Sequence, residues 1–163
     1  METARLLREH KDIHFIIVGD GSRRAESENF TIAHKLTDTV HFIGRYPSSA
    51  MPYFYDNASL LYIGLNDAPV LGLTAPAKLQ GYMASGKPIL GMLSGEGADL
   101  IADADCGWSV PAESPQELAD LILKIKGIPQ EQLTAKGMNG KMFCQQHFQL
   151  DHCIDNLEAI INA

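Results

Sequence analysis

The sequence predicts an α/β protein built on a parallel sheet with helices on both faces. Short apolar runs rich in β-branched residues alternate with helical segments along the 163-residue chain. These runs are largely apolar rather than alternating, which is typical of strands buried on both faces. The connections are long enough for helices, and parallel strands require such crossovers. This is the doubly wound class, in which ligands bind outside the carboxyl ends of the strands.

The first third of the chain supplies two strands. A short helix at Glu2–Glu9 precedes a strand at His14–Val18. Glycines 19 and 21 then turn the chain into a polar helix at about Ser22–Leu36, because glycine adopts backbone conformations that other residues avoid. A second strand follows at Val40–Ile43.

The remaining elements continue the alternation. Residues 47–57 look helical with an interruption at Pro52, and a buried strand follows at 59–63. After a loop at 66–75, a helix begins at Pro76 and stops at Gly86, and the next strand opens at Pro88. The last predicted elements are a helix at 98–103, a strand at 107–110, a helix at 115–126 capped by Ser114, and two tail helices at 130–163 broken near 147–148. We expect one domain over residues 1–163.

The start of the predicted helix at Pro76 suits an anion. Proline in a first turn costs little, since its missing N–H would be unpaired there. The free N–H groups beyond it carry the positive end of the helix dipole. Lys78 adds a mobile cation in the same turn, where a purely structural lysine would be slightly unfavourable. We therefore predict a phosphate or diphosphate at this turn.

Bulk properties exclude several classes. Hydrophobic residues make up 45% of the chain and charged residues 20%, which are globular values. The net charge of −7 argues against a nucleic-acid partner. Three irregularly spaced cysteines form neither a disulfide framework nor a zinc pattern, so we expect a reducing cytoplasm. No metal site is predicted, and no apolar run reaches membrane-spanning length.

Four motifs resemble the C-terminal, donor-binding half of GT-B glycosyltransferases. The main one is PAKLQGYMASGKPIL at 76–90, similar to the family pattern P-S-K-x-x-E-Y-M-A-x-G-K-P. The others, in family order, are FIIVGDG at 15–21 with Arg23 behind it, VHFIGR at 40–45, and GEGADLI at 95–101 followed by GWSVP at 107–111. The closest similarity is to the retaining, family-4 or group 1 type that builds bacterial surface polysaccharides.

The resemblance implies a Rossmann-like domain that binds a nucleotide-diphosphate sugar, with a UDP-sugar favoured. It implies no metal and no other cofactor, and it names no catalytic residue in this chain. The donor-binding residues that it implies are Gly19, Gly21, Arg23, Tyr46, Pro76, Lys78, Leu79 and Glu96. Simpler interpretations stay open for two of these segments. Glycines 19 and 21 could serve a tight turn alone, and Glu96 could be a carboxylate favoured only by its helix dipole.

Two positions depart from the family pattern. Relatives carry two glutamates eight positions apart, the second of which holds the ribose, and Leu73 and Gly81 replace them here. A glycine has no side chain to accept a hydroxyl hydrogen bond, a contact worth about 1–3 kcal/mol. Ala77 also replaces the usual serine, and Arg24 occupies the third-glycine place of a dinucleotide fingerprint, which disfavours an NAD site.

The resemblance also implies that the chain is a fragment. The family's domain opens with a central strand, and this chain starts at Met1 in the helix that follows. We expect an absent N-terminal acceptor domain, no activity in isolation, and self-association through the gap. In the complete enzyme we expect a cytoplasmic protein, at most peripheral to the inner membrane. The alternatives are a non-catalytic nucleotide-binding or partner module and a sugar-nucleotide epimerase fragment.

Overall fold

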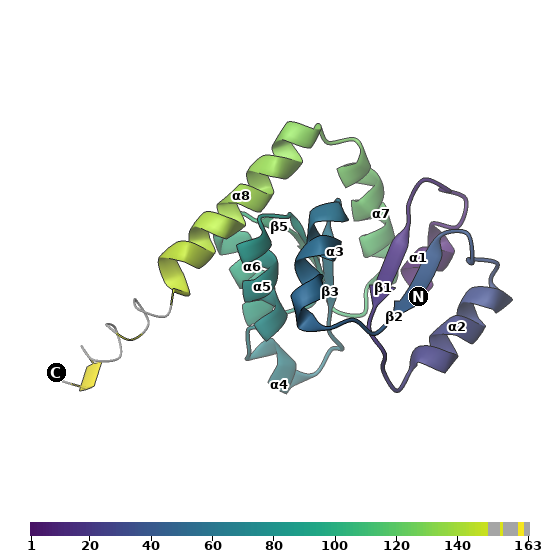
Figure 1. Cartoon of the computed structure of the whole chain (residues 1–163), viewed down its shortest axis with the longest axis horizontal. Coiled ribbons are helices and arrows are strands. Elements are labelled where there is room, and N and C mark those ends of the chain that lie inside the picture. The colour runs from purple at the N-terminus through teal and green to yellow at the C-terminus, as the bar shows by residue number, and fades with distance from the viewer. Residues whose placement is uncertain (150–153, 155–159, 162–163) are drawn as a thin grey trace. The chain divides into compact units, whose positions relative to one another are not determined.

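The structure, a computed structural model, describes residues 1–149, 154 and 160–161 (Figure 1). It divides into two compact units. Unit 1 comprises Met1–Met51 and Pro115–Lys126, and unit 2 comprises Pro52–Ser114 and Gly127–Ala163. Each unit is described by itself.

Unit 1 contains a two-stranded parallel sheet and its helices. The elements are α1 (Glu2–Leu6), β1 (Phe15–Val18), α2 (Arg24–Ala33), β2 (Val40–Gly44), the 3-10 turn η1 (Ser48–Ala50) and α7 (Pro115–Lys126). Phe15 pairs with Val40 and Ile17 with Phe42, so these four side chains share one face of the sheet. That face packs with Ala4 of α1 and with Phe30 and Leu36, which forms the core of the unit.

Unit 2 contains a three-stranded parallel sheet in the order β3-β4-β5. Its elements are α3 (Met51–Asn57), β3 (Leu61–Gly64), α4 (Pro69–Gly72), α5 (Ala77–Ser85), β4 (Ile89–Met92), α6 (Glu96–Asp103), β5 (Gly107–Val110) and α8 (Gln130–His147). Leu61 pairs with Ile89, which in turn pairs with Gly107, so the three strands run in register.

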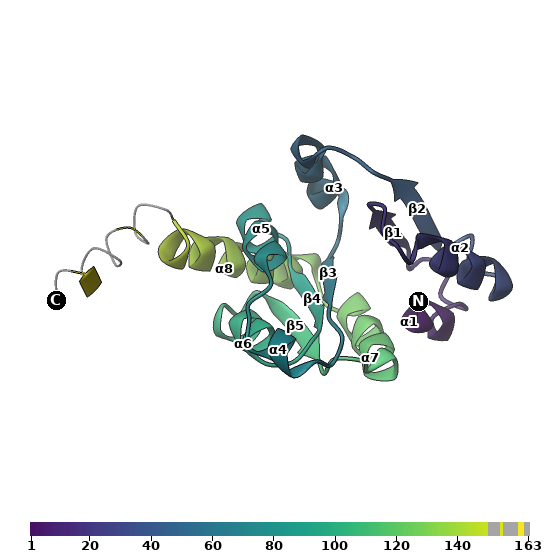
Figure 2. The same ribbon diagram turned by 90° about the horizontal axis from the view of Figure 1, so that it is seen from below.

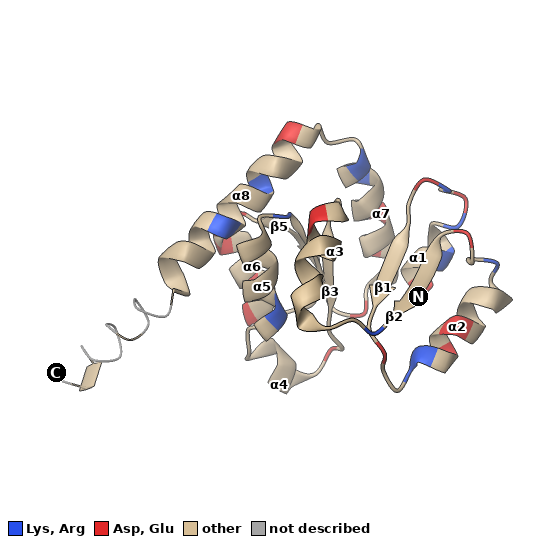
Figure 3. Ribbon diagram, in the orientation of Figure 1, with Lys and Arg blue, Asp and Glu red and all other residues tan. Residues whose placement is uncertain are grey.

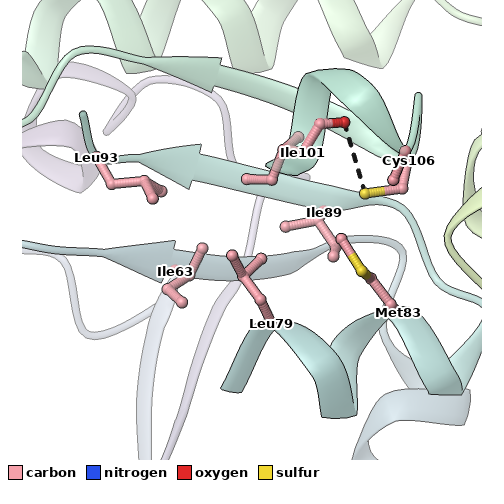
Figure 4. Packing of buried hydrophobic residues seen from close by; sticks show 8 residues of the cluster. Ile63, Leu79, Met83, Ile89, Leu93, Ile101 and Cys106 are labelled. Atoms are coloured by element: carbon pink, nitrogen blue, oxygen red, sulfur yellow. Dashed lines mark hydrogen bonds between the residues drawn. The ribbon is translucent and has the colours of Figure 1, made fainter. Parts of the chain in front are cut away.

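Helices α5 and α6 share a core with one face of this sheet (Figure 2). Figure 4 shows Leu79 and Met83 of α5 pointing at Ile63 and Ile89 of the strands. Ile101 of α6 joins the same cluster, and all of these side chains are at most 5% exposed. Burying a side chain of this size stabilises the fold by about 1.5–3 kcal/mol. This core fixes the positions at which α5 and α6 begin.

The predicted α/β class is confirmed, and each of the five predicted strands is present. The expected single sheet is instead two sheets, because β1 pairs only with β2 and β3 only with β4 among the described residues. The predicted helices did not include α4, and Pro52 does not interrupt a helix but lies in the first turn of α3. Proline is tolerated there since the N–H that it lacks would have no partner.

Other boundaries differ only at the ends. Helix α2 is shorter than predicted, Arg24–Ala33, and α5 begins one residue later, with Pro76 as its N-cap. Gly86 ends α5 at φ 73°, the left-handed conformation expected of a C-terminal glycine. Helix α8 ends at His147, near the predicted break, and most of the second tail helix lies outside the described residues. Across the described residues, no helix combines the length and apolarity needed to cross a membrane.

Candidate functional site

Three loops gather at the carboxyl end of the unit 2 sheet. The loop after β3 carries α4, and the loop after β4 leads into α6. These two loops touch at Gly95 and Gly72: a Cβ atom built on Gly95 would lie 2.1 Å from the Gly72 carbonyl oxygen. Gly95 has φ 73°, which other residues rarely adopt. Glycine at position 95 is therefore required both by the backbone conformation and by the close approach.

The first turns of α5 and α6 lie side by side in this region. A Cβ atom on Gly97 would lie 3.0 Å from Cδ of Pro76, so the second residue of α6 rests against the N-cap of α5. Each helix start has N–H groups without an intrahelical acceptor and the positive end of a dipole. Two such helix starts together form a setting suited to a diphosphate.

Two charged side chains flank these helix starts. Lys78 is the second residue of α5 and is exposed, and its ammonium group has no hydrogen-bond or ion-pair partner among the described residues. Glu96 is the first residue of α6 and is also exposed. A carboxylate at this position is stabilised by the α6 dipole. Lys78 is thus free to meet an incoming anion.

The loop after β5 is hydrogen-bonded to the loops after β3 and β4. The Ala112 N–H donates to Oγ of Ser94 at 3.1 Å, which links this loop to the one after β4. The Asp67 N–H donates to Oε1 of Glu113 at 3.4 Å, which links it to the loop after β3. Sequence analysis missed Ser94 and Glu113, because their roles depend on loops far apart in the chain. The local signal is that Ser94 lies two residues after the end of β4 and Glu113 three residues after the end of β5.

In unit 1, Gly19 and Gly21 follow the carboxyl end of β1, as predicted. The Gly19 N–H donates to the Gly44 carbonyl oxygen at 2.7 Å, and the residue has φ 135°. A Cβ atom at Gly19 or Gly21 would meet no other atom within 4 Å. Open space beside both residues leaves room for a ligand against the backbone.

Arg23 is already paired in this structure. Its Nε and Nη2 donate to the two carboxylate oxygens of Glu26 at 2.9 and 2.7 Å. This fork raises the pKa of Arg23 and lowers the pKa of Glu26. Arg24 donates likewise to Glu28 at 2.7 Å. A donor phosphate would have to compete with Glu26 for the Arg23 guanidinium.

Tyr46 and Leu79 differ in exposure. Tyr46 is 48% exposed just beyond β2, whereas Leu79 is completely buried in the unit 2 core. The Leu79 N–H donates to the Pro76 carbonyl oxygen at 2.9 Å. Neither the Leu79 side chain nor its N–H is therefore available to a ligand in this conformation, and the residue's observed role is to anchor α5 in the core.

The two departures from the family pattern lie at the surface. Leu73 is 78% exposed at the end of α4. Gly81 lies in α5, and a Cβ atom there would meet nothing within 4 Å. The first atom of a side chain at position 81 therefore fits without moving its neighbours. We also expect the loops that follow the strands of both units to form a single rim, and this stays a prediction.

Burial governs the chemistry of the Cys106 thiol. Burial raises the pKa of the Cys106 thiol to about 11, and its Sγ lies 3.7 Å from the Ile101 carbonyl oxygen (Figure 4). A neutral, buried thiol is a packing group rather than a nucleophile. No cluster of three or more histidine, cysteine or carboxylate side chains suited to a metal ion occurs in the described part of the chain.

Comparisons with solved structures give several chains of similar fold. Anabaena HepE in complex with UDP and glucose superposes with a TM-score of 0.79 at 18% identity, covering 98% of this chain and 43% of that one. The C-terminal domain of the group 1 glycosyl transferase LpcC from Francisella tularensis gives a TM-score of 0.68 at 19% identity, covering 91% of this chain and 77% of that one. At these identities the likeness concerns the fold.

Sequence comparison gives the same family. The chain is 24% identical over 157 residues to an uncharacterized glycosyltransferase of Methanocaldococcus jannaschii, covering 91% of this chain and 40% of that protein. The chain thus spans less than half of the length of that relative. The model of the family described as glycosyl transferases group 1 matches residues 1–140. The chain therefore belongs to the glycosyl transferases group 1 family.

Proposed function

We propose that this chain is the donor-binding part of a retaining glycosyltransferase that uses a UDP-sugar. The observation that carries the proposal is the pair of adjacent helix starts in unit 2, at Pro76 and Gly97, with the unpartnered Lys78 beside them. A diphosphate is the group of a nucleotide sugar that such a setting recognises. The family match favours a transferase over an epimerase.

The same groups would assist the reaction. When the bond between the sugar and the diphosphate breaks, negative charge grows on the leaving diphosphate. Backbone N–H groups held in place by the helix starts stabilise that charge without reorganising, and the Lys78 ammonium group adds a positive charge beside them. Glu96, at the start of α6, would lie at the edge of the same site. Gly19, Gly21, Arg23 and Tyr46 are proposed as further donor contacts from unit 1.

The choice of UDP is supported by the contents of similar structures. HepE has been solved with UDP and with UDP-glucose. The pneumococcal O-GlcNAc transferase GtfA, at a TM-score of 0.75 and 15% identity, has been solved with UDP and GlcNAc. We propose a surface polysaccharide or lipid-linked glycan as the acceptor, bound by an N-terminal domain, and a cytoplasmic location with peripheral membrane contact.

Titration calorimetry tests the donor assignment. We expect UDP to bind with a dissociation constant in the micromolar range, and GDP at least about tenfold more weakly, a difference of about 1.4 kcal/mol. The loss of both family glutamates, at Leu73 and Gly81, motivates the alternative of a partner module without transferase activity. Failure of every nucleotide and nucleotide sugar to bind would support that module and refute the donor-binding function.

We also propose that the isolated chain self-associates through its open strand edges. Among the described residues, β1 is paired on one side only and so is β3. Unpaired edges present backbone N–H and C=O groups that another chain can pair with. Tyr62, 45% exposed on β3, is a suitable position for a blocking charge. We expect light scattering to detect dimers or larger species that Tyr62→Lys reduces, whereas a monomer at all concentrations contradicts the proposal.

A further inference from the structure

A shallow cavity of about 300 Å³, open to solvent and lined by exposed side chains, lies in unit 1 away from the proposed donor contacts. Its lining residues are Arg8, Glu9, Lys11, His34 and Lys35. They come from the two segments that precede β1 and β2, which follow α1 and α2. In a parallel pair the amino ends of both strands lie at the same end of the sheet. Gly19 and Tyr46 follow the strands at the opposite, carboxyl end. The cavity is thus separate from the donor contacts proposed in this unit.

Two buried leucines hold the walls of this cavity in place. Leu7 is 3% exposed and Leu36 is 1% exposed, and each anchors one of the two segments. The His10 N–H donates to the Leu7 carbonyl oxygen at 2.9 Å, and the Leu36 N–H donates to the Thr31 carbonyl oxygen at 2.9 Å. The charged residues next to these anchors therefore extend from turns of defined conformation.

The charges that line the cavity do not balance. Arg8, Lys11 and Lys35 face one carboxylate, that of Glu9, which already accepts a hydrogen bond from Nε of Arg8 at 3.0 Å. Neither lysine has a carboxylate partner among the described residues. The cavity therefore has an excess of positive charge within a chain of net charge −7.

Helix dipoles explain only part of this arrangement. Cations are favoured at helix C-termini, which accounts for Lys35 just after α2 and for Arg8 just after α1. Lys11 lies beyond that influence, five residues after the end of α1, since the dipole effect falls off within one turn. Unit 2 contains just four of the 13 lysines and arginines, so the basic residues, blue in Figure 3, belong mostly to unit 1.

We propose that this cavity binds a phosphate-bearing anion. Two ammonium groups and a guanidinium around one small cavity match the charge of a phosphate, and charge-assisted hydrogen bonds to phosphate are among the stronger ones. A volume of about 300 Å³ lies at the small end of ligand sites, which fits a phosphate or diphosphate group better than a whole nucleotide. The group can belong to a soluble phosphate or to a phospholipid headgroup.

The test uses inorganic pyrophosphate and follows the backbone amide NMR signals of His34 and Leu36. These signals report binding at the cavity and are separate from those of the unit 2 helix starts. The variant pair is Lys11→Ala with Lys35→Gly. Lys35 has φ 56°, a conformation that glycine adopts without strain, so its replacement removes the charge without loosening the turn. Lys124→Ala, a lysine of α7 outside the cavity, is the matched control.

We expect saturable shifts whose dissociation constant rises about tenfold or more in the double variant, which corresponds to the loss of at least one of the two charge-assisted contacts. Lys124→Ala and Lys78→Ala should leave the shifts unchanged. In a second arm, vesicles containing phosphatidic acid are compared with neutral phosphatidylcholine vesicles. Binding of the acidic vesicles alone, lost in the double variant, would assign the phosphate to a lipid. Absence of binding in both arms, or equal binding by the double variant, overturns the proposal.

Discussion

Gly137 of α8 lies directly against the carbonyl group of Gly86, the residue that ends α5. A Cβ atom on Gly137 would be 2.0 Å from that oxygen and 3.0 Å from Cα of Lys87, so no side chain fits. One turn along, a Cβ atom on Gly140 would be 2.8 Å from Cβ of Cys106. These two glycines allow α8 to lie against the end of α5 and the start of β5. Helix α8 thereby supports the helix whose first turn carries Lys78.

We expect Gly137→Ala to destabilise the protein by about 1–3 kcal/mol, the usual cost of overpacking a tight contact. The gain in helix propensity, up to about 1 kcal/mol, cannot offset a clash with backbone atoms. Urea unfolding followed by circular dichroism measures the change. Gly81→Ala is the matched control, because Gly81 is also helical but has open space around it. The control should be neutral or stabilised. Equal stability of Gly137→Ala and the native protein would contradict the packing described above.

Lys78→Ala should weaken binding of UDP by roughly 10- to 150-fold, equivalent to about 1.5–3 kcal/mol for a hydrogen bond to a charged group. The reason is that Lys78 is exposed and unpartnered among the described residues beside two helix starts. Titration calorimetry gives the dissociation constant, and the unfolding midpoint should stay the same. Lys141→Ala, an exposed lysine of α8, is the control and should bind normally. An unchanged constant in Lys78→Ala would remove this residue from the site.

Gly81→Glu should tighten UDP binding, since the family pattern implies a carboxylate at this position that holds the ribose. The open space at this position accommodates the side chain. A hydrogen bond of this kind is worth about 1–3 kcal/mol, or roughly 5- to 150-fold in affinity. Gly81→Ala controls for the gain in helix stability. Binding of inorganic pyrophosphate separates the two causes: equal tightening for pyrophosphate and UDP would rule out a ribose contact.

Cys106 should make stability fall in alkaline solution. Burial raises the pKa of its thiol from 9.0 to about 11, so the folded protein keeps a proton that the unfolded chain loses. The contribution of this thiol to the free energy of unfolding is therefore fully present below pH 9 and is lost as the pH rises from 9 towards 11. At 1.36 kcal/mol per pKa unit, this loss is at most about 2.7 kcal/mol.

Urea unfolding at pH 8 and pH 10.5 checks this dependence. Lysines and tyrosines also titrate in this range, so the useful quantity is the difference between the native protein and Cys106→Ala. Cys106→Ala should be less stable than the native protein at pH 8, because it loses a buried sulfur. Between pH 8 and pH 10.5, its free energy of unfolding should fall by less than that of the native protein. The same loss in both proteins would show that Cys106 is not the cause.

The amino-acid sequence by itself determined the order and kind of the main elements. Continuous apolar runs marked all five strands, and Gly86 and Pro88 marked the end of α5 and the start of β4 within one residue. These signals are local: backbone freedom at glycine, the missing N–H of proline, and the apolar character of a strand. Motif similarity then led to the family, which the match over residues 1–140 confirmed.

Only the tertiary structure decided the contacts between distant segments. The sequence could not indicate that Pro76 rests on Gly97, that Asp67 bonds to Glu113, or that Leu79 is buried while Lys78 beside it is exposed. Each depends on how far a loop extends after its strand and on which turn of a helix faces the core. Helix α4 escaped prediction for a similar reason, since a four-residue helix has too little periodicity to be recognised. Strand pairing into two sheets also depends on which edges meet, and no local pattern specifies that.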